Sequence, residues 1–135
     1  MSIGENREIL LRCIDSYNLC TMDWLNTYYS KTVEWISMPT QMDPNGRKGG
    51  FKEFWDASER FLQLVPNRKL RVISSVCEND IVILEQELKG NFARDGGSFK
   101  AGAESSAIVV SFFTIKDSLI IRHKDYCVRN VMGLT

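Results

Sequence analysis

His123 is the single histidine of this 135-residue chain, and an aspartate, Asp125, follows it two residues later. Residues two apart on a β-strand point to the same face, so the carboxylate could orient the imidazole, or both could meet one substrate. Imidazole titrates near neutral pH and is a common general acid or base, contributing about 10²–10⁴-fold to a rate when positioned. Alternatively, the polar run 122–125 is a strand end that faces solvent or a second subunit. We take His123 and Asp125 as the candidate acid/base pair.

Two tyrosines and a pair of glutamates could add polar groups to such a site. The phenols of Tyr17 and Tyr126 could donate a hydrogen bond to a carbonyl or enolate oxygen. Tyr17 is therefore a third candidate catalytic residue, and Tyr126 a candidate substrate contact. Glu85 and Glu87 share one face of a strand-like segment, and a carboxylate inside an apolar cavity could act as acid or base, so Glu87 is a further candidate contact. The alternative for the two tyrosines is ordinary packing in the core, and the alternative for the two glutamates is an exposed strand face.

Aromatic side chains are the candidate apolar walls of a binding site. Phe51, Trp55 and Phe61 belong to one stripe at helical spacing, and Trp35 lies in a strand-like segment. Flat apolar rings of this kind can contact an apolar cyclic ligand. The alternative for each of the four is plain packing in the core.

The cysteines indicate neither a metal site nor a disulfide framework. Cys13, Cys20, Cys77 and Cys127 lie far apart and form no CxxC pair. With one histidine there is no imidazole cluster, so we expect no metal, and we also expect no cofactor. An even count could mean two disulfides, but a core this apolar does not need them. We expect free thiols and a reducing cytoplasm.

The overall composition excludes two classes of partner. The chain has 17 Lys+Arg and 17 Asp+Glu, and the charge is evenly spread, so nucleic acid and anionic membranes are poor partners. No apolar run is long enough to span a membrane, and charges interrupt the N-terminal segment where a signal peptide would need an apolar run. The length and the 44% hydrophobic content fit one globular domain, residues 1–135.

The elements that must position these side chains follow from periodicity and turn residues. A capping box at Ser2–Glu5 begins a helix of about 15 residues, and Thr21 can cap a short second helix. The segment 40–50 is predicted as a loop, whose Gly46–Gly50 part suits a flexible lid, with anion binding as the alternative. Long strands with short turns predict an antiparallel meander. The remaining predicted elements are a strand at 32–38, a helix at 51–65 and strands at 70–77, 81–92, 105–115 and 119–128.

The segment Ile108–Ile115 is apolar at both of its alternating sets of positions. Both faces of this strand therefore favour burial. Helices can cover one face of the sheet, and a second copy of the chain can cover the other. We expect a homodimer through the sheet.

The order helix, short helix, strand, helix and meander resembles the nuclear transport factor 2-like superfamily, and most closely its SnoaL-like branch of polyketide cyclases and ketosteroid isomerase-like proteins. The resemblance covers nearly the whole chain and implies an α+β fold, with a cone-shaped, curved antiparallel sheet wrapped on three helices around an apolar internal pocket. The segments that carry it are Asp23-Trp24-Leu25, Thr32-Val33-Glu34-Trp35, Gly46 to Phe54, Val65-Pro66-Asn67-Arg68, Glu78-Asn79-Asp80-Ile81-Val82 with Lys89-Gly90, and Asp117-Ser118-Leu119-Ile120 to Asp125-Tyr126.

The catalytic residues of that superfamily transfer poorly to this sequence. Trp35 occupies the position of the ketosteroid isomerase general base, and Val109 falls near the acidic oxyanion donor. The helix-one tyrosine falls near Asp15, although Tyr17 is close by. Many relatives end the last strand in Tyr-x-Asp, where this chain has Val128. The resemblance therefore implies the fold and pocket more strongly than a reaction.

Two functions from different classes follow. The first is a cofactor-independent enzyme of isomerase, cyclase or lyase type, acting by acid/base chemistry on a small apolar cyclic molecule that is polyketide- or terpenoid-like. The second is a non-catalytic ligand-binding or assembly domain of the same fold. The missing family carboxylates favour the second, whereas the His123–Asp125 pair and the single-domain relatives favour the enzyme.

Overall fold

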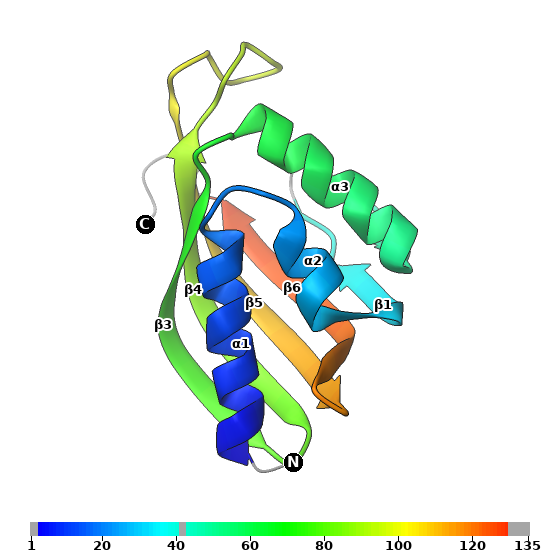
Figure 1. The fold of residues 1–135 in the computed structure, drawn as a ribbon. Coiled ribbons are helices and arrows are strands. Elements are labelled where there is room, and N and C mark those ends of the chain that lie inside the picture. Colours follow the sequence, from blue (N-terminus) through cyan, green and yellow to red (C-terminus); the bar gives the residue numbers. More distant parts are fainter. Residues whose placement is uncertain (1–2, 41–42, 130–135) are drawn as a thin grey trace.

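A computed structural model describes residues 3–40 and 43–129 of the chain. The fold is α+β, with three helices and a six-stranded sheet within these residues (Figure 1). The predicted cap residue Ser2 lies outside the described residues. In chain order the elements are α1 (Ile3–Tyr17), α2 (Asp23–Tyr28), β1 (Tyr29–Ser37), β2 (Arg47–Gly49), α3 (Phe51–Leu64), β3 (Lys69–Glu78), β4 (Ile81–Asn91), β5 (Glu104–Lys116) and β6 (Leu119–Arg129).

The predicted meander is confirmed, since β3, β4, β5 and β6 pair antiparallel in sequence order. Local turn chemistry explains the tight connections. Asp117 and Ser118 both have positive φ, at 52° and 66°, which matches the twist of a two-residue hairpin turn between β5 and β6. Asn79, with φ 53°, has the same role between β3 and β4, and asparagine tolerates this conformation better than most residues.

The prediction of a purely antiparallel sheet is wrong. The sheet is mixed, in the order β2-β1-β6-β5-β4-β3, because β1 lies parallel to β6. No short turn joins these two strands, so local sequence does not set their relative direction. The predicted 40–50 loop also contains the short strand β2, which pairs antiparallel with β1. An isolated edge strand of three residues has too little alternation to be recognised from sequence.

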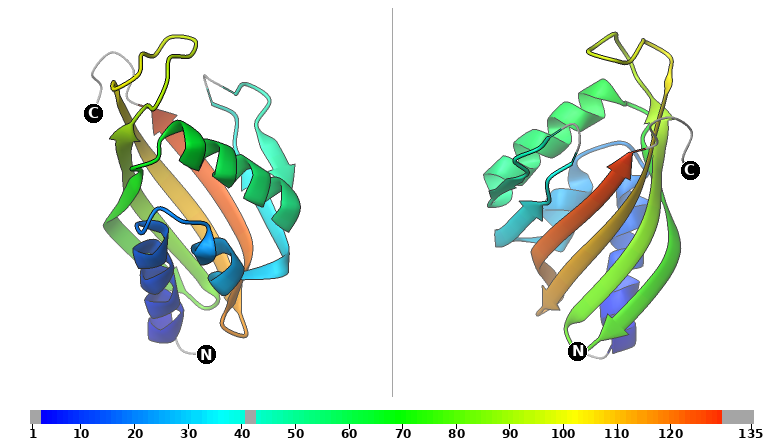
Figure 2. Two further views of the ribbon diagram at one scale, coloured as in Figure 1. Left: turned by 45° about the horizontal axis from the view of Figure 1, so that its top comes forward. Right: turned by 180° about the vertical axis from the view of Figure 1, so that it is seen from behind.

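All three helices lie on one face of the sheet, and the view from behind shows the opposite face without a helix over it (Figure 2). The aromatic stripe of α3 directs Phe54 into the core, where Trp24 of α2 and Trp35 of β1 contact its ring. An irregularity between Val72 and Ser74 interrupts the β3–β4 register, and such bulges bend a strand. The strand β3 is therefore expected to bend at this point.

No helix within the described residues has the length and apolarity needed to cross a membrane. The four cysteines are free thiols, as predicted, and Cys13 is fully buried. Apolar side chains on the helix-free face of the sheet keep substantial exposure; they include Val76, Ile81, Phe112, Tyr126 and Val128.

Candidate active site

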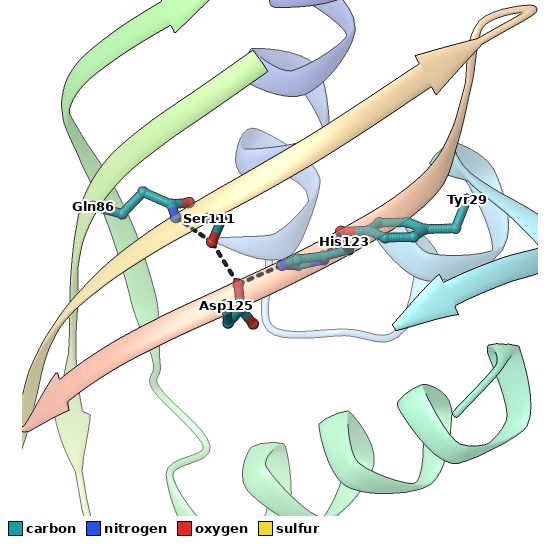
Figure 3. Close-up of polar contacts among 5 residues, drawn as sticks. All are labelled: Tyr29, Gln86, Ser111, His123 and Asp125. Carbon is teal, nitrogen blue, oxygen red and sulfur yellow. Dashed lines mark hydrogen bonds and ion pairs between the residues drawn. The ribbon is translucent and has the colours of Figure 1, made fainter. Parts of the chain in front are cut away.

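The last strand, β6, presents His123 and Asp125 on the face of the sheet that the helices cover. Alternation along the strand puts both side chains on this face. The His123 Nε2 atom lies 2.6 Å from Asp125 Oδ1 (Figure 3). The structure therefore brings together the two residues that the sequence pairs.

His123 is buried and is hydrogen-bonded at both ring nitrogens. Its Nδ1 lies 2.8 Å from the hydroxyl of Tyr29, the first residue of β1. Burial raises the pKa of Tyr29 well above its ordinary value, so the phenol stays protonated and can donate a hydrogen bond to Nδ1. In the neutral imidazole the ring proton then lies on Nε2 and is donated to Asp125. Aromatic rings of Phe54 and Phe113 pack against the imidazole at centroid distances of 5.1 and 4.5 Å.

Asp125 is held through one of its two carboxylate oxygens. Its Oδ1 accepts the His123 hydrogen bond and a second one, at 2.5 Å, from Ser111 Oγ. Ser111 in turn accepts a hydrogen bond from Gln86 Nε2 at 2.9 Å. Among the described residues no hydrogen bond reaches Asp125 Oδ2, and the side chain of Asp125 is 22% exposed. The second oxygen is the free acceptor of this network.

The network crosses four strands, which explains why sequence reasoning found only part of it. Ser111 pairs with Asp125 in the β5–β6 register, and Gln86 reaches Ser111 from β4. Ser111 lies between the apolar residues Val109 and Phe113 on one face of β5, and Gln86 follows Leu84 on the same face of β4. A polar residue among apolar residues on one strand face indicates a buried hydrogen bond, and this signal is present in the sequence although it was not used above. Tyr29 had no such signal.

A cavity of about 230 Å³ lies between the helices and the covered face of the sheet. Its apolar lining includes Leu10, Ile14, Trp24, Trp35, Phe54 and Phe113. The polar groups in its wall include Tyr17, Ser37, Ser111, His123, Asp125 and Arg129. Trp35 lines the cavity as a flat wall, and its ring stacks on Phe54 at 5.0 Å with a 15° angle between the planes. One wall of the cavity therefore carries the network, facing aromatic rings.

Tyr17, the last residue of α1, also lines the cavity. Burial raises the pKa of its phenol to about 12, and the positive charge of Arg68 opposes that rise. The Arg68 guanidinium lies 3.7 Å from the Tyr17 ring centroid and donates to the Tyr17 carbonyl oxygen at 2.9 Å. Among the described residues the Tyr17 hydroxyl has no hydrogen-bond partner, so it is a protonated donor at the cavity wall.

The other predicted site residues divide into two groups. Phe61 of α3 lines the cavity. Phe51 and Trp55 stack on each other, 6.2 Å between centroids, and are not among the lining residues. Glu87 lies on the helix-free face, where it pairs with Arg71 at 3.3 Å. Tyr126 lies on that face too, beside Phe112 and 39% exposed. The structure does not bring Phe51, Trp55, Glu87 or Tyr126 to the cavity.

No metal cluster emerges from the described part of the chain. No group of three or more His, Cys, Asp or Glu side chains there is arranged to hold a metal ion. Arg47, in the glycine-rich segment, lines the cavity, but its Nε already bonds Asp43 Oδ2 at 2.7 Å.

Comparisons with known proteins support the fold. No protein-family model matches the chain, and no curated protein does. Among solved structures, AclR, a candidate hydroxylase from Streptomyces galilaeus, matches with a TM-score of 0.79 and 19% identity, over 98% of this chain and 80% of its own. IdmH, a candidate polyketide cyclase from Streptomyces antibioticus, matches with a TM-score of 0.78 and 11% identity, over 90% of this chain and 91% of its own.

A third solved structure, a candidate SnoaL-like polyketide cyclase from Jannaschia sp. CCS1, matches with a TM-score of 0.75 and 17% identity, over 94% of this chain and 88% of its own. At these identities the comparisons establish the fold alone. The fold is shared with solved structures described as SnoaL-like polyketide cyclases, which agrees with the fold that the sequence resemblance implies.

Proposed function

We propose that the chain is a cofactor-independent enzyme of isomerase, cyclase or lyase type, with Asp125 as its general base. The proposal rests on a difference between the two oxygens of the Asp125 carboxylate. Oδ1 is held by His123 and Ser111, while Oδ2 has no hydrogen bond from the described residues, and Asp125 is one of the residues that line the cavity. A base needs an unoccupied lone pair within reach of the proton that it removes.

This proposal changes the roles that the sequence suggested for the pair. Tyr29 and Asp125 use both nitrogens of His123, so the imidazole has no free atom to accept a substrate proton. Its proposed role is to orient Asp125 and to donate a hydrogen bond to Oδ1 before and after the proton is transferred to Oδ2. Ser111 provides a second donor to the same oxygen. Both hydrogen bonds restrict rotation of the carboxylate and so aim Oδ2.

The substrate in this proposal is an apolar cyclic compound with an acidic C–H bond beside a carbonyl group. The rings of Trp35 and Phe54 would contact its apolar body within the cavity. As Asp125 Oδ2 takes the proton, the electron pair of the C–H bond moves toward the carbonyl oxygen. The protonated phenol of Tyr17 would donate a hydrogen bond to that oxygen. The neighbours described as polyketide cyclases make a polyketide-like substrate the first to try.

We also propose that the chain forms a homodimer through the helix-free face of the sheet. The apolar residues Phe112, Tyr126 and Val128 lie exposed there, and a second copy of the same face would remove them from water.

The free state of all four cysteines fits a protein of the reducing cytoplasm.

Base catalysis can be tested without knowing the substrate by using 5-nitrobenzisoxazole as a proton-transfer probe. A base removes the C3 proton, the C–H electron pair becomes the third bond of a nitrile, and the N–O bond breaks to leave a coloured phenolate. We expect the native chain to accelerate this reaction and Asp125→Asn to lower kcat/KM by at least about 10²-fold. Asp117→Asn, in the exposed β5–β6 turn, is the matched control and should retain the native rate.

Equal rates for Asp125→Asn and the native chain, with both folded, would contradict the proposed base. The chain would then be better explained as a non-catalytic binding domain. The two hydrogen bonds of the His123 ring would serve only to stabilise the cavity wall. Mass spectrometry of small molecules that co-purify with the native chain would identify the ligand class in either case.

A further inference from the structure

Arg129 places a positive charge in the cavity wall, four residues beyond Asp125 on the same face of β6. That spacing corresponds to roughly 13 Å along a strand. Two neighbours hold the guanidinium. Nη1 donates to Ser105 Oγ of β5 at 3.0 Å, and the guanidinium carbon lies 5.4 Å from the Phe61 ring centroid on α3. The cation is therefore anchored between the sheet and α3.

The charge of Arg129 is not neutralised by an ion pair within the described residues. A guanidinium has five N–H donors, of which Ser105 takes one. The other arginine that lines the cavity, Arg47, differs because Asp43 pairs with it at 2.7 Å. Arginine is suited to binding a carboxylate, since its planar donors match the two oxygens. Both arginines keep free N–H donors, but Asp43 offsets the charge of Arg47, whereas no ion pair within the described residues offsets the charge of Arg129.

The cavity between Asp125 and Arg129 lies in the electrostatic fields of both groups. Burial raises the pKa of the Cys127 thiol, while Arg129 opposes that rise and Asp125 adds to it. The phenol of Tyr17 is influenced by the same two charges. A ligand in this part of the cavity would meet a negative group toward one end and a positive group toward the other.

We propose that Arg129 binds a carboxylate group of the substrate, so that the cavity takes an apolar cyclic acid in preference to its neutral counterpart. The inference rests on the proposed function for the part that Asp125 has in the reaction. The carboxylate at Arg129 would keep the negative end of the substrate away from Asp125 and direct its apolar body along the cavity toward the base.

Calorimetric titration with 2-naphthoate and 2-naphthamide tests this, because the two probes share an apolar body and differ in charge. We expect the native chain to bind 2-naphthoate at least about 10-fold more tightly. Arg129→Gln should remove the preference by weakening 2-naphthoate alone, and Arg129→Lys should retain part of it because the charge remains. Arg71→Gln is the matched control, since Arg71 pairs with Glu87 on the opposite face of the sheet.

Three results would overturn the proposal. The first is that the native chain binds the two probes with equal affinity. The second is that folded Arg129→Gln still prefers 2-naphthoate as strongly as the native chain does. The third is that Arg47→Gln loses this preference while Arg129→Gln keeps it. If Arg129→Gln does not fold, the ¹⁵Nε resonance of Arg129 in the native chain decides. A shift with 2-naphthoate and none with 2-naphthamide supports the proposal, and no shift with 2-naphthoate contradicts it.

Asp125→Asn separates this inference from the proposed function. The variant should keep its preference for 2-naphthoate, because Arg129 is unchanged, while it loses turnover of 5-nitrobenzisoxazole. If the preference depends on Arg129 but turnover does not depend on Asp125, the carboxylate site stands and the proposed base fails. The reverse pattern retains the base and rejects the carboxylate site.

Discussion

Tyr29 decides which way the hydrogen bonds of the candidate site run. Its buried hydroxyl donates to His123 Nδ1, and the imidazole then donates from Nε2 to Asp125. Without this donor, Nδ1 would be a buried nitrogen with no partner, or the ring would move its proton to Nδ1 and lose the bond to the carboxylate. The orientation of the Asp125 carboxylate thus depends on Tyr29, which does not hydrogen-bond to it.

Tyr29→Phe should therefore destabilise the fold and disturb the imidazole. We expect the free energy of unfolding to fall by about 1–3 kcal/mol, the cost of leaving a buried group unpaired. His123 is the only histidine of the chain, so its ¹⁵N ring resonances can be observed without ambiguity and should report the altered tautomer. Tyr126→Phe, on an exposed tyrosine, should change stability by less than about 0.5 kcal/mol. Unchanged His123 resonances in Tyr29→Phe would contradict this role.

At the scale of elements, the segment that follows α3 lies very close to the backbone of β4 at Gly90. A Cβ atom at Gly90 would lie 2.3 Å from Val65 Cγ1 and 3.0 Å from Asn67 Oδ1. Asn67 also accepts the Asn91 backbone N–H at 2.8 Å, so the corner is tied to the strand. The corner between α3 and β3 therefore packs directly against β4 at Gly90.

Gly90→Ala should destabilise the fold by about 1–3 kcal/mol, because the added methyl overpacks a site that has no room. Val65→Ala removes the nearest atom, so the double variant should lose less stability than the sum of the single variants. Urea unfolding of the four proteins provides the double-mutant cycle. A strictly additive result would contradict the contact as the source of the strain.

At the scale of the whole molecule, the helices of the described residues cover one face of the sheet, and no described helix covers the other (Figure 2). The covered face holds the cavity and the polar network. The open face combines exposed apolar residues with charged pairs such as Arg71–Glu87. Phe112 and Tyr126 contact each other on this face. Exposed apolar residues that gather on one face are typical of an interaction surface, which is why we propose a second copy of the chain there.

Sedimentation velocity at micromolar concentration tests the homodimer. We expect a species of about 31 kDa, twice the 15.5 kDa chain. Phe112→Glu should shift it to the monomer, because burying an unpaired charge in an apolar interface is unfavourable. Leu19→Glu, at an exposed residue between α1 and α2, should leave the dimer intact. A native chain that sediments as a monomer would remove the proposal.

Periodicity and turn residues were enough to predict α3, the four strands of the meander and the shared face of His123 and Asp125. Each of these depends on neighbours in the sequence, where backbone geometry sets the side-chain direction. The parallel pairing of β1 with β6, the strand β2 and the convergence of Tyr29, Ser111 and Gln86 depend on contacts between distant segments. Only the tertiary structure decided these features, and with them which Asp125 oxygen is free. The register of distant strands is set by packing of the whole core, which no local pattern encodes.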